Sequence, residues 1–223
     1  GAGRTDAGVH ALAQIAHIAT ARKMPPRNLL AGLNDLLPAN INIRKIEEIP
    51  PDFHARHHAK SRSYIYIISR RRMAFGKKYV GCVKDRLDLN RMETVMKLFP
   101  GFHDFASFAD KRRDKNESSM VNLQSAELHA FDDLIVFRIV GSHFLWKMVR
   151  RMVGIAVEVG KGNHSPSDVR QMLVSPSELP SKLTAPSSGL FLEHVLYEGD
   201  ALPPLTLPFP PFFMPSLCLK VRV

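Results

Sequence analysis

Cysteine is scarce in this sequence, and long apolar runs are absent. The 223 residues include two cysteines, Cys82 and Cys218. Two are too few for the disulfide framework of a small secreted domain, and they argue against a cysteine zinc site. We therefore expect a reducing compartment or an organelle. No stretch approaches the roughly 18 uninterrupted apolar residues of a membrane-spanning helix, so the sequence predicts no membrane segment.

Acidic residues are also few compared with basic ones. Asp and Glu total 21 against 31 Lys and Arg, which gives a formal net charge of +10. An excess of this size favours a polyanionic partner, with nucleic acid as the first candidate and a merely basic protein as the alternative. Because 45% of the residues are hydrophobic, the chain can form one large globular domain or two small ones.

Glycine is concentrated at the start of the chain, where residues 1–10 read GAGRTDAGVH. This spacing indicates a loop that turns tightly or lets a ligand approach. An ordinary turn, in which Asp6 bonds its own backbone, is the commoner meaning of Asp-x-Gly. A dinucleotide loop is excluded because the Asp6 carboxylate would repel a pyrophosphate, and a phosphate loop because no Gly-Lys-Ser/Thr follows.

The apolar pattern predicts a mixture of strands and helices. Strands are predicted at 9–18, 41–49, 64–68, 121–131 and 134–140, and helices at 27–37, 89–99, 144–160 and 166–173. Asp132 and Asp133 predict the turn of a hairpin. Phe102, Phe105 and Phe108 repeat every third residue, which indicates a helical stripe in the core.

The helix predicted at 144–160 is apolar over most of its surface, yet two adjacent arginines lie near its middle. Lys147 and Arg151 are four residues apart and are predicted to share a solvated face, whereas Arg150 points about 100° away and should face inward. Stranding one member of a buried ion pair costs about 3–5 kcal/mol, so Arg150 needs a carboxylate partner or must be compensated otherwise. Asp6 is the candidate.

Several blocks of the sequence resemble the tRNA pseudouridine synthase A family. They cover nearly everything from Gly3 to Tyr197 in the family's order, and the chain is also similar to the animal pseudouridine synthase-like proteins. The blocks are GRTDAGVHA at 3–11, FHAR at 53–56, RSYIY at 62–66, GFHDFASF at 101–108, FLWKMVR at 144–150 and the closing strand at 189–197.

The resemblance implies an α+β fold of two related halves, whose antiparallel sheets meet at a central cleft with helices packed behind. Residues 1–60 are then the remainder of the N-terminal half with the catalytic loop, and 61–198 form the C-terminal half. Residues 199–223 are a proline-rich tail expected to be irregular. The family's first strand and helix precede the aspartate loop and have no counterpart here, so we expect an N-terminally truncated chain.

The implied activity is that of an isomerase, which converts uridine to pseudouridine in the anticodon arm of tRNA. Such chemistry requires a flipped nucleotide and a pocket that receives it. Asp6 is then the catalytic nucleophile, Arg4 the wedge that fills the vacated stack, Arg150 the counter-ion of Asp6, and Tyr64 the ring that packs on the base. Attack on C1′ and attack on C6 both remain open. No cofactor and no metal are implied.

The expected partners are tRNA and a second copy of the chain, since the family grips tRNA as a homodimer. Arg56 and the basic loop residues Lys111, Arg112 and Arg113 are predicted to contact the RNA. The nearby His54, His57 and His58 lack an acid or cysteine at ligand spacing, so we expect them to be solvated or to face RNA.

The competing hypothesis is a non-catalytic tRNA- or RNA-binding protein, or an inactive fragment. It follows from the absence of the family's first strand, whose loss exposes a sheet edge and leaves the aspartate loop without an anchor. For location, we expect the mitochondrial matrix, with the cytoplasm or nucleus as the alternative.

Overall fold

The computed structural model describes residues 1–21, 24–110 and 118–207. In this part of the chain, a seven-stranded sheet has the order β1-β7-β2-β6-β5-β4, and β3 pairs with the end of β2. The strands are β1 His10–Ala11, β2 Ser61–Ser69, β3 Gly81–Cys82, β4 Gly101–Asp104, β5 Met120–Phe131, β6 Leu134–Gly141 and β7 Leu190–Leu196. The helices are α1 Pro26–Leu36, α2 Leu89–Met96, α3 Met148–Lys161, α4 Pro166–Val174 and α5 Leu179–Lys182.

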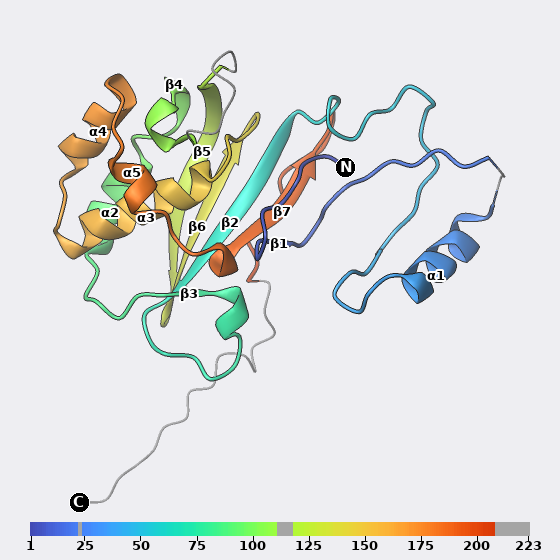
Figure 1. The fold of residues 1–223 in the computed structure, drawn as a ribbon, viewed down its shortest axis with the longest axis horizontal. Helices are drawn as coiled ribbons and strands as arrows, with labels where there is room; N and C mark the ends of the chain where they lie inside the picture. Colours follow the sequence, from blue (N-terminus) through green and yellow to red (C-terminus); the bar gives the residue numbers. More distant parts are fainter. Residues whose placement is uncertain (22–23, 111–117, 208–223) are drawn as a thin grey trace, which may run out of the picture.

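The α+β class is confirmed, and the sheet is continuous from β1 to β4 (Figure 1). Its long strands β2, β5, β6 and β7 are antiparallel neighbours, whereas β1 joins β7 in parallel through the pair His10 and Phe191. Residues 1–60 therefore contribute only β1 to the sheet among the described strands. The predicted division of the chain at residue 60 stays a prediction.

Strand β2 alternates between the two faces of the sheet, as its period of two requires. Tyr66 and Ile68 belong to the larger core, which also contains buried side chains of α2, α3 and α4. These helices and α5 lie on one face (Figure 1). Ile65 and Ile67 belong to a smaller cluster on the opposite face. The tyrosines of β2 therefore share the helix-covered face.

The opposite face carries a buried ion pair between β6 and β7. The Arg138 Nε donates to Glu193 Oε2 at 2.8 Å, and both side chains are less than a tenth exposed. Ser63 Oγ also donates to this carboxylate at 2.6 Å, and Arg138 Nη2 donates to the carbonyl oxygen of Pro203 at 2.7 Å. These extra bonds satisfy charges that burial removes from water. They join the sheet to residues 199–207, which contain no helix or strand.

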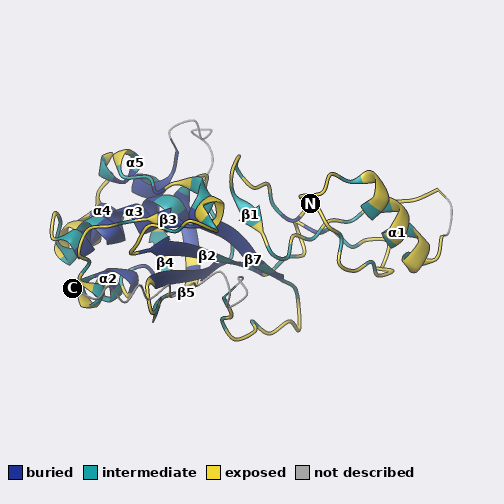
Figure 2. Cartoon of the chain, turned by 90° about the horizontal axis from the view of Figure 1, so that it is seen from below, coloured by how far each residue is buried: buried dark blue, intermediate teal, exposed yellow. Residues whose placement is uncertain are grey.

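Helix α1 was predicted correctly, but it stands away from the sheet and contains no buried residue (Figures 1 and 2). The strand predicted at 41–49 is wrong, because this segment forms no strand and pairs with none of the described strands β1 to β7. Instead, the Asn34 side chain donates to the Ile43 carbonyl oxygen at 2.9 Å and accepts from its N–H at 2.7 Å. The strand predicted at 9–18 is reduced to the two residues of β1.

The helical stripe predicted from three phenylalanines is also wrong in part. Phe102 lies on β4, which pairs with β5, and it is 67% exposed. Phe105 and Phe108 are fully buried, as a core position requires. The spacing of three arises because a short strand is followed directly by a 3₁₀ turn at Ala106–Phe108.

A glycine in α3 allows the close approach of the segment that precedes β7. A Cβ atom added at Gly154 would lie 1.7 Å from the Leu183 carbonyl oxygen. We expect Gly154→Ala to lower the free energy of unfolding by about 1–3 kcal/mol, because backbone must move to admit the methyl group. Urea denaturation measures this.

Gly32→Ala is the matched control, since Gly32 lies in α1 with no atom within 4 Å of an added Cβ. Alanine is favoured over glycine in a helix by up to about 1 kcal/mol, so the control should not lose stability. Equal urea midpoints for the Gly154 variant and the parent protein would contradict the close packing of Leu183 against Gly154.

Candidate active site

The opening loop holds the Asp6 backbone in a turn but leaves its carboxylate available. The N–H of Val9 donates to the Asp6 carbonyl oxygen at 3.0 Å, and Gly8 adopts a φ of +77°. An added Cβ at Gly8 would lie 2.6 Å from Ser187 Oγ. Glycine is therefore required there by conformation and by space. The turn predicted as the ordinary alternative does form, yet it does not use the carboxylate.

The Asp6 carboxylate lies between the neutral indole of Trp146 and the cationic guanidinium of Arg150. Its Oδ1 accepts a hydrogen bond from Trp146 Nε1 at 2.8 Å. Its Oδ2 is 3.9 Å from Nη1 of Arg150, which is an electrostatic contact but too long for a hydrogen bond. The Asp6 side chain is 32% exposed and that of Arg150 is 15% exposed. One side of the carboxylate therefore remains open to solvent.

Arg150 is held in place by contacts other than Asp6. Its Nε donates to the Ala185 carbonyl oxygen at 2.7 Å, and the Ala185 N–H donates to the Arg150 carbonyl oxygen at 3.0 Å. The guanidinium thus has a fixed orientation before any substrate binds. A positive charge arranged in advance is effective because it needs no reorganisation during a reaction.

The prediction that Arg151 faces solvent is wrong. Arg151 is 5% exposed; its Nη1 donates to the Ala109 carbonyl oxygen, and its Nη2 lies 3.3 Å from Asp110 Oδ2. Lys147 Nζ donates to the same oxygen at 3.0 Å. Helix α3 begins only at Met148, and the segment before residue 111 covers this side of it. Helical spacing alone could not reveal that cover.

Tyr64 lies on the helix-covered face of β2, close enough to Asp6 for the two to interact electrostatically. Its ring meets Phe144 edge to face, with centroids 4.9 Å apart. Burial raises the pKa of the Tyr64 hydroxyl above its ordinary value; the Arg62 charge lowers it, and the Asp6 carboxylate raises it further. The hydroxyl is therefore neutral at physiological pH. The structure brings Tyr64, Asp6 and Arg150 into one region.

Sequence reasoning assigned no role to Arg62, the first residue of the RSYIY block. Its guanidinium joins segments that are far apart in the chain, and its five donors in a planar fork suit several acceptors at once. It donates to the carbonyl oxygens of Arg56 at 2.7 Å, Ser142 at 2.8 Å, Ala59 at 3.2 Å and Ala2 at 3.3 Å. The alternation of β2 was an available signal, since it places Arg62 on the same face as Tyr64.

The remaining predicted site residues are less tightly placed. Arg4 is exposed on the opening loop, two residues before Asp6. Arg56 is exposed in the turn that follows Phe53, and its carbonyl oxygen is one of the Arg62 acceptors. The predicted RNA contacts Lys111, Arg112 and Arg113 lie outside the described residues.

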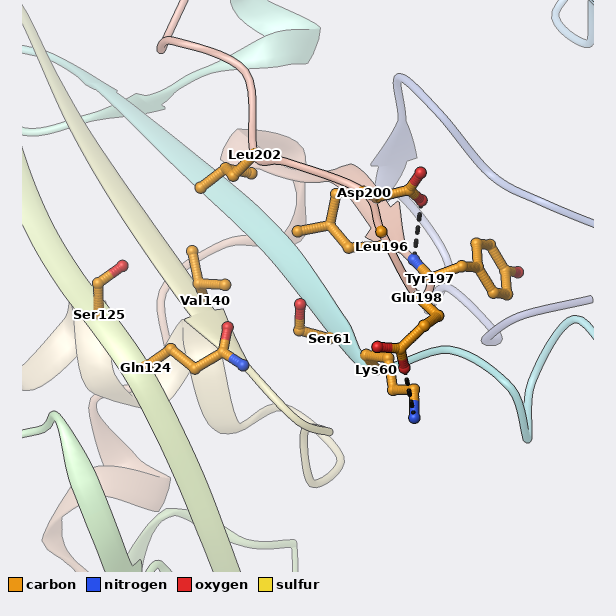
Figure 3. A pocket seen from close by; sticks show the side chains of 11 residues that line it. Lys60, Ser61, Gln124, Ser125, Val140, Leu196, Tyr197, Glu198, Asp200 and Leu202 are labelled. Carbon is orange, nitrogen blue, oxygen red and sulfur yellow. Dashed lines mark hydrogen bonds and ion pairs between the residues drawn. The ribbon is translucent and has the colours of Figure 1, made fainter.

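A hollow of about 430 Å³ lies on the face of the sheet opposite the helices (Figure 3). None of the predicted site residues lines it. The ion pair between Lys60 and Glu198 stands at its edge, with a distance of 2.8 Å. Within residues 1–21, 24–110 and 118–207, no group of three His, Cys, Asp or Glu side chains is arranged to hold a metal ion. Over the same residues, no helix has both the length and the apolar character needed to cross a bilayer.

Comparison with known proteins identifies the family. A family model described as tRNA pseudouridine synthase matches residues 95–198. The chain is 40% identical over 196 residues to tRNA pseudouridine synthase A of Exiguobacterium sp. strain AT1b, covering 88% of this chain and 79% of that protein. The Geobacillus kaustophilus protein of the same name is 36% identical over 202 residues, covering 90% and 78% of the two chains. The Pelodictyon phaeoclathratiforme protein is 39% identical over 199 residues, covering 88% and 80%. This chain belongs to the tRNA pseudouridine synthase A family.

Membership of the tRNA pseudouridine synthase A family confirms the resemblance that the sequence blocks indicated, and it makes the chain a member of a family of isomerases. The region matched by the family model contains α3 with Arg150, and it ends before the tail. Asp6 lies outside that region.

The turn after Phe53 contains a pH-sensitive contact, the hydrogen bonds that the His54 ring accepts from the backbone. His54 Nδ1 accepts hydrogen bonds from the N–H groups of Arg56 and His57, each at 3.2 Å. Burial lowers the pKa of His54 below its ordinary value of 6.5, as do the neighbours His57, His17 and His58 and the terminal amino group. The folded state therefore prefers the neutral ring. Its contribution to stability is complete above pH 6.5 and is lost as the pH falls towards the lower folded pKa.

We expect His54→Asn to reduce the loss of thermal stability between pH 7.5 and pH 5.5. The Asn side-chain oxygen can still accept from backbone N–H groups, but it does not titrate. Thermal unfolding of the parent and the variant at both pH values measures the difference. Identical pH dependence in the two proteins would show that protonation of His54 does not weaken this turn.

Proposed function

We propose that this protein is a tRNA pseudouridine synthase that isomerises a uridine in the anticodon arm, with Asp6 as the nucleophile. One observation carries the proposal: a solvent-accessible carboxylate is held by Trp146 Nε1 and faces the fixed cation Arg150. Membership of a family of tRNA-modifying isomerases supports the same conclusion. A two-carboxylate glycoside hydrolase would require a second carboxylate beside Asp6. In the described residues, the side chains that contact the Asp6 carboxylate are Trp146 and Arg150.

The proposed reaction breaks the bond between N1 of uracil and C1′ of the ribose and forms a bond between C5 and C1′. The proton lost from C5 is balanced by one gained at N1, so the product is an isomer and needs no redox cofactor. Attack by Asp6 on either C1′ or C6 requires an ionised carboxylate, and Arg150 places a positive charge 3.9 Å from Oδ2. Tyr64 offers a ring on which the flipped base packs.

Binding of tRNA is proposed to rest on phosphate contacts of the basic side chains. The net charge of +10 supplies the long-range attraction. Arg4, exposed beside Asp6, would fill the space that the flipped base leaves in the stack. Arg56 and Lys111 to Arg113 would contact the backbone of the RNA. We further propose a homodimer that grips one tRNA across both subunits, located in the mitochondrial matrix.

Asp6→Asn should abolish the reaction, because an amide cannot act as the nucleophile. Tritium release from tRNA transcribed with 5-tritiated uridine should fall at least ~10³-fold. Asp35→Asn is the control, since Asp35 is exposed on α1 and its substitution removes the same charge. Equal release by the Asp6 variant and the parent would exclude Asp6 as the nucleophile. No release by the parent would favour the non-catalytic RNA-binding alternative.

Charge reversal of Lys111, Arg112 and Arg113 should weaken tRNA binding without changing the rate at saturating tRNA. Each lost phosphate contact should reduce the slope of log K against log salt by about 0.7–0.9. Filter binding at several salt concentrations measures both quantities. Lys97→Glu, at the exposed end of α2, is the control for a single charge reversal outside the proposed interface. An unchanged salt dependence in the triple variant would remove these three residues from the proposed interface.

A further inference from the structure

Trp146 makes a direct hydrogen bond to the proposed nucleophile, although sequence reasoning gave it no role. Its Nε1 donates to Asp6 Oδ1 at 2.8 Å across 140 positions of the chain. The side chain is 42% exposed, so core packing does not explain its position. An indole N–H donates and cannot accept, and it carries no charge. It can therefore fix the orientation of a carboxylate without adding a second cation.

The residue after Trp146 holds the indole in place. Lys147 has a left-handed backbone with a φ of +62°, which is uncommon outside glycine and recurs at functional sites. Its ammonium group lies 4.5 Å from the centre of the indole ring. The same ammonium donates to Asp110 Oδ2 at 3.0 Å, and that carboxylate also pairs with the buried Arg151. A chain of contacts thus runs from the buried Arg151 to Asp6.

Arg150 cannot perform the same task. Its nearest nitrogen to the Asp6 carboxylate is 3.9 Å from Oδ2, and its Nε is already bonded to the Ala185 carbonyl oxygen. Arg150 therefore provides charge, but no hydrogen bond that would stop the carboxylate from rotating about its Cβ–Cγ bond. The Trp146 bond to Oδ1 does restrict that rotation, and Oδ2 accepts no such bond from the described residues.

We propose that Trp146 is a positioning residue for Asp6, and that Oδ2 is the attacking oxygen. The inference rests on the proposed function and deepens it. Lys147 assists, because its ammonium group lies over the face of the indole ring and attracts it. Loss of the indole N–H should therefore lower the rate of the chemical step, while tRNA binding and the stability of the fold change little.

The chain has one tryptophan, which makes a single-atom test possible. Expression in a tryptophan auxotroph supplied with benzothienylalanine replaces the N–H of Trp146 by sulfur and changes no other residue. We expect kcat for tritium release to fall about tenfold, as for loss of a hydrogen bond to a charged group, with KM within about twofold. Trp146→His, which keeps a ring N–H, should retain a higher kcat than Trp146→Phe, which has no N–H to donate. Phe102→Leu, an exposed aromatic on β4, should match the parent.

The bond itself has a spectroscopic readout that does not depend on activity. A ¹⁵N–¹H spectrum contains one indole resonance, and its proton should move upfield in Asp6→Ala, which removes the acceptor. Asp35→Ala should leave it in place. Lys147→Asn retains a residue that tolerates the left-handed backbone but removes the ammonium; it should broaden or shift the indole resonance and lower kcat by less than benzothienylalanine does.

The outcomes separate the two proposals. If the parent releases tritium and the benzothienylalanine protein releases it equally fast, Trp146 has no positioning role and the proposed function stands. An indole resonance that is unchanged in Asp6→Ala also overturns the positioning role. If the parent releases no tritium, the proposed function fails and the positioning role fails with it. A fall in kcat accompanied by a large loss of thermal stability indicates a structural role and counts against the proposal.

Discussion

The guanidinium of Arg62 is the constraint on which the site depends. It donates to four carbonyl oxygens, from Ala2, Arg56, Ala59 and Ser142, and so joins the opening loop, the turn after Phe53 and the end of β6. Burial lowers the pKa of Arg62, yet the guanidinium stays charged because the ordinary pKa of arginine is so high. A lysine has three donors on one nitrogen and could not reach all four acceptors. The bond from Arg62 to Ala2 adds to the other attachments of the opening loop, which are the pairing of β1 with β7 and the bond from Trp146 to Asp6.

A second constraint acts from the helix-covered side. Gly154 lets the backbone at Leu183 contact α3, and two residues later Ala185 exchanges hydrogen bonds with Arg150. On the same stretch, the Pro186 carbonyl oxygen accepts from the buried hydroxyl of Tyr66 at 2.9 Å. The site is therefore fixed mainly by side chains that bond to backbone carbonyls. Such contacts set positions accurately because the backbone they use is itself packed against α3 and the sheet.

This construction explains which parts were predictable from sequence. Strongly periodic elements such as the β5–β6 hairpin, β2 and α3 follow from local pattern, and the local motif pointed to Asp6. The segment at 41–49 failed because alternation is satisfied only where a neighbouring strand exists, and Arg151 failed because its cover comes from residues 109–110. Arg62 and Trp146 were missed for a related reason. The partners of Arg62 are backbone carbonyl oxygens, and the partner of Trp146 lies 140 positions away in the chain. Neither kind of contact produces a periodic pattern in the sequence.

Within the site, charge and orientation are supplied by different residues, and the proposed chemistry gives this separation a purpose. A carboxylate that forms a close bidentate pair with arginine is strongly stabilised, and both of its oxygens are committed. A nucleophile must instead offer a lone pair. At 3.9 Å, Arg150 places a positive charge beside Oδ2 without a hydrogen bond to that oxygen, while the neutral indole of Trp146 bonds the other oxygen. The proposed nucleophile Asp6 is therefore oriented by one residue and faced by the charge of another, and Oδ2 can still attack.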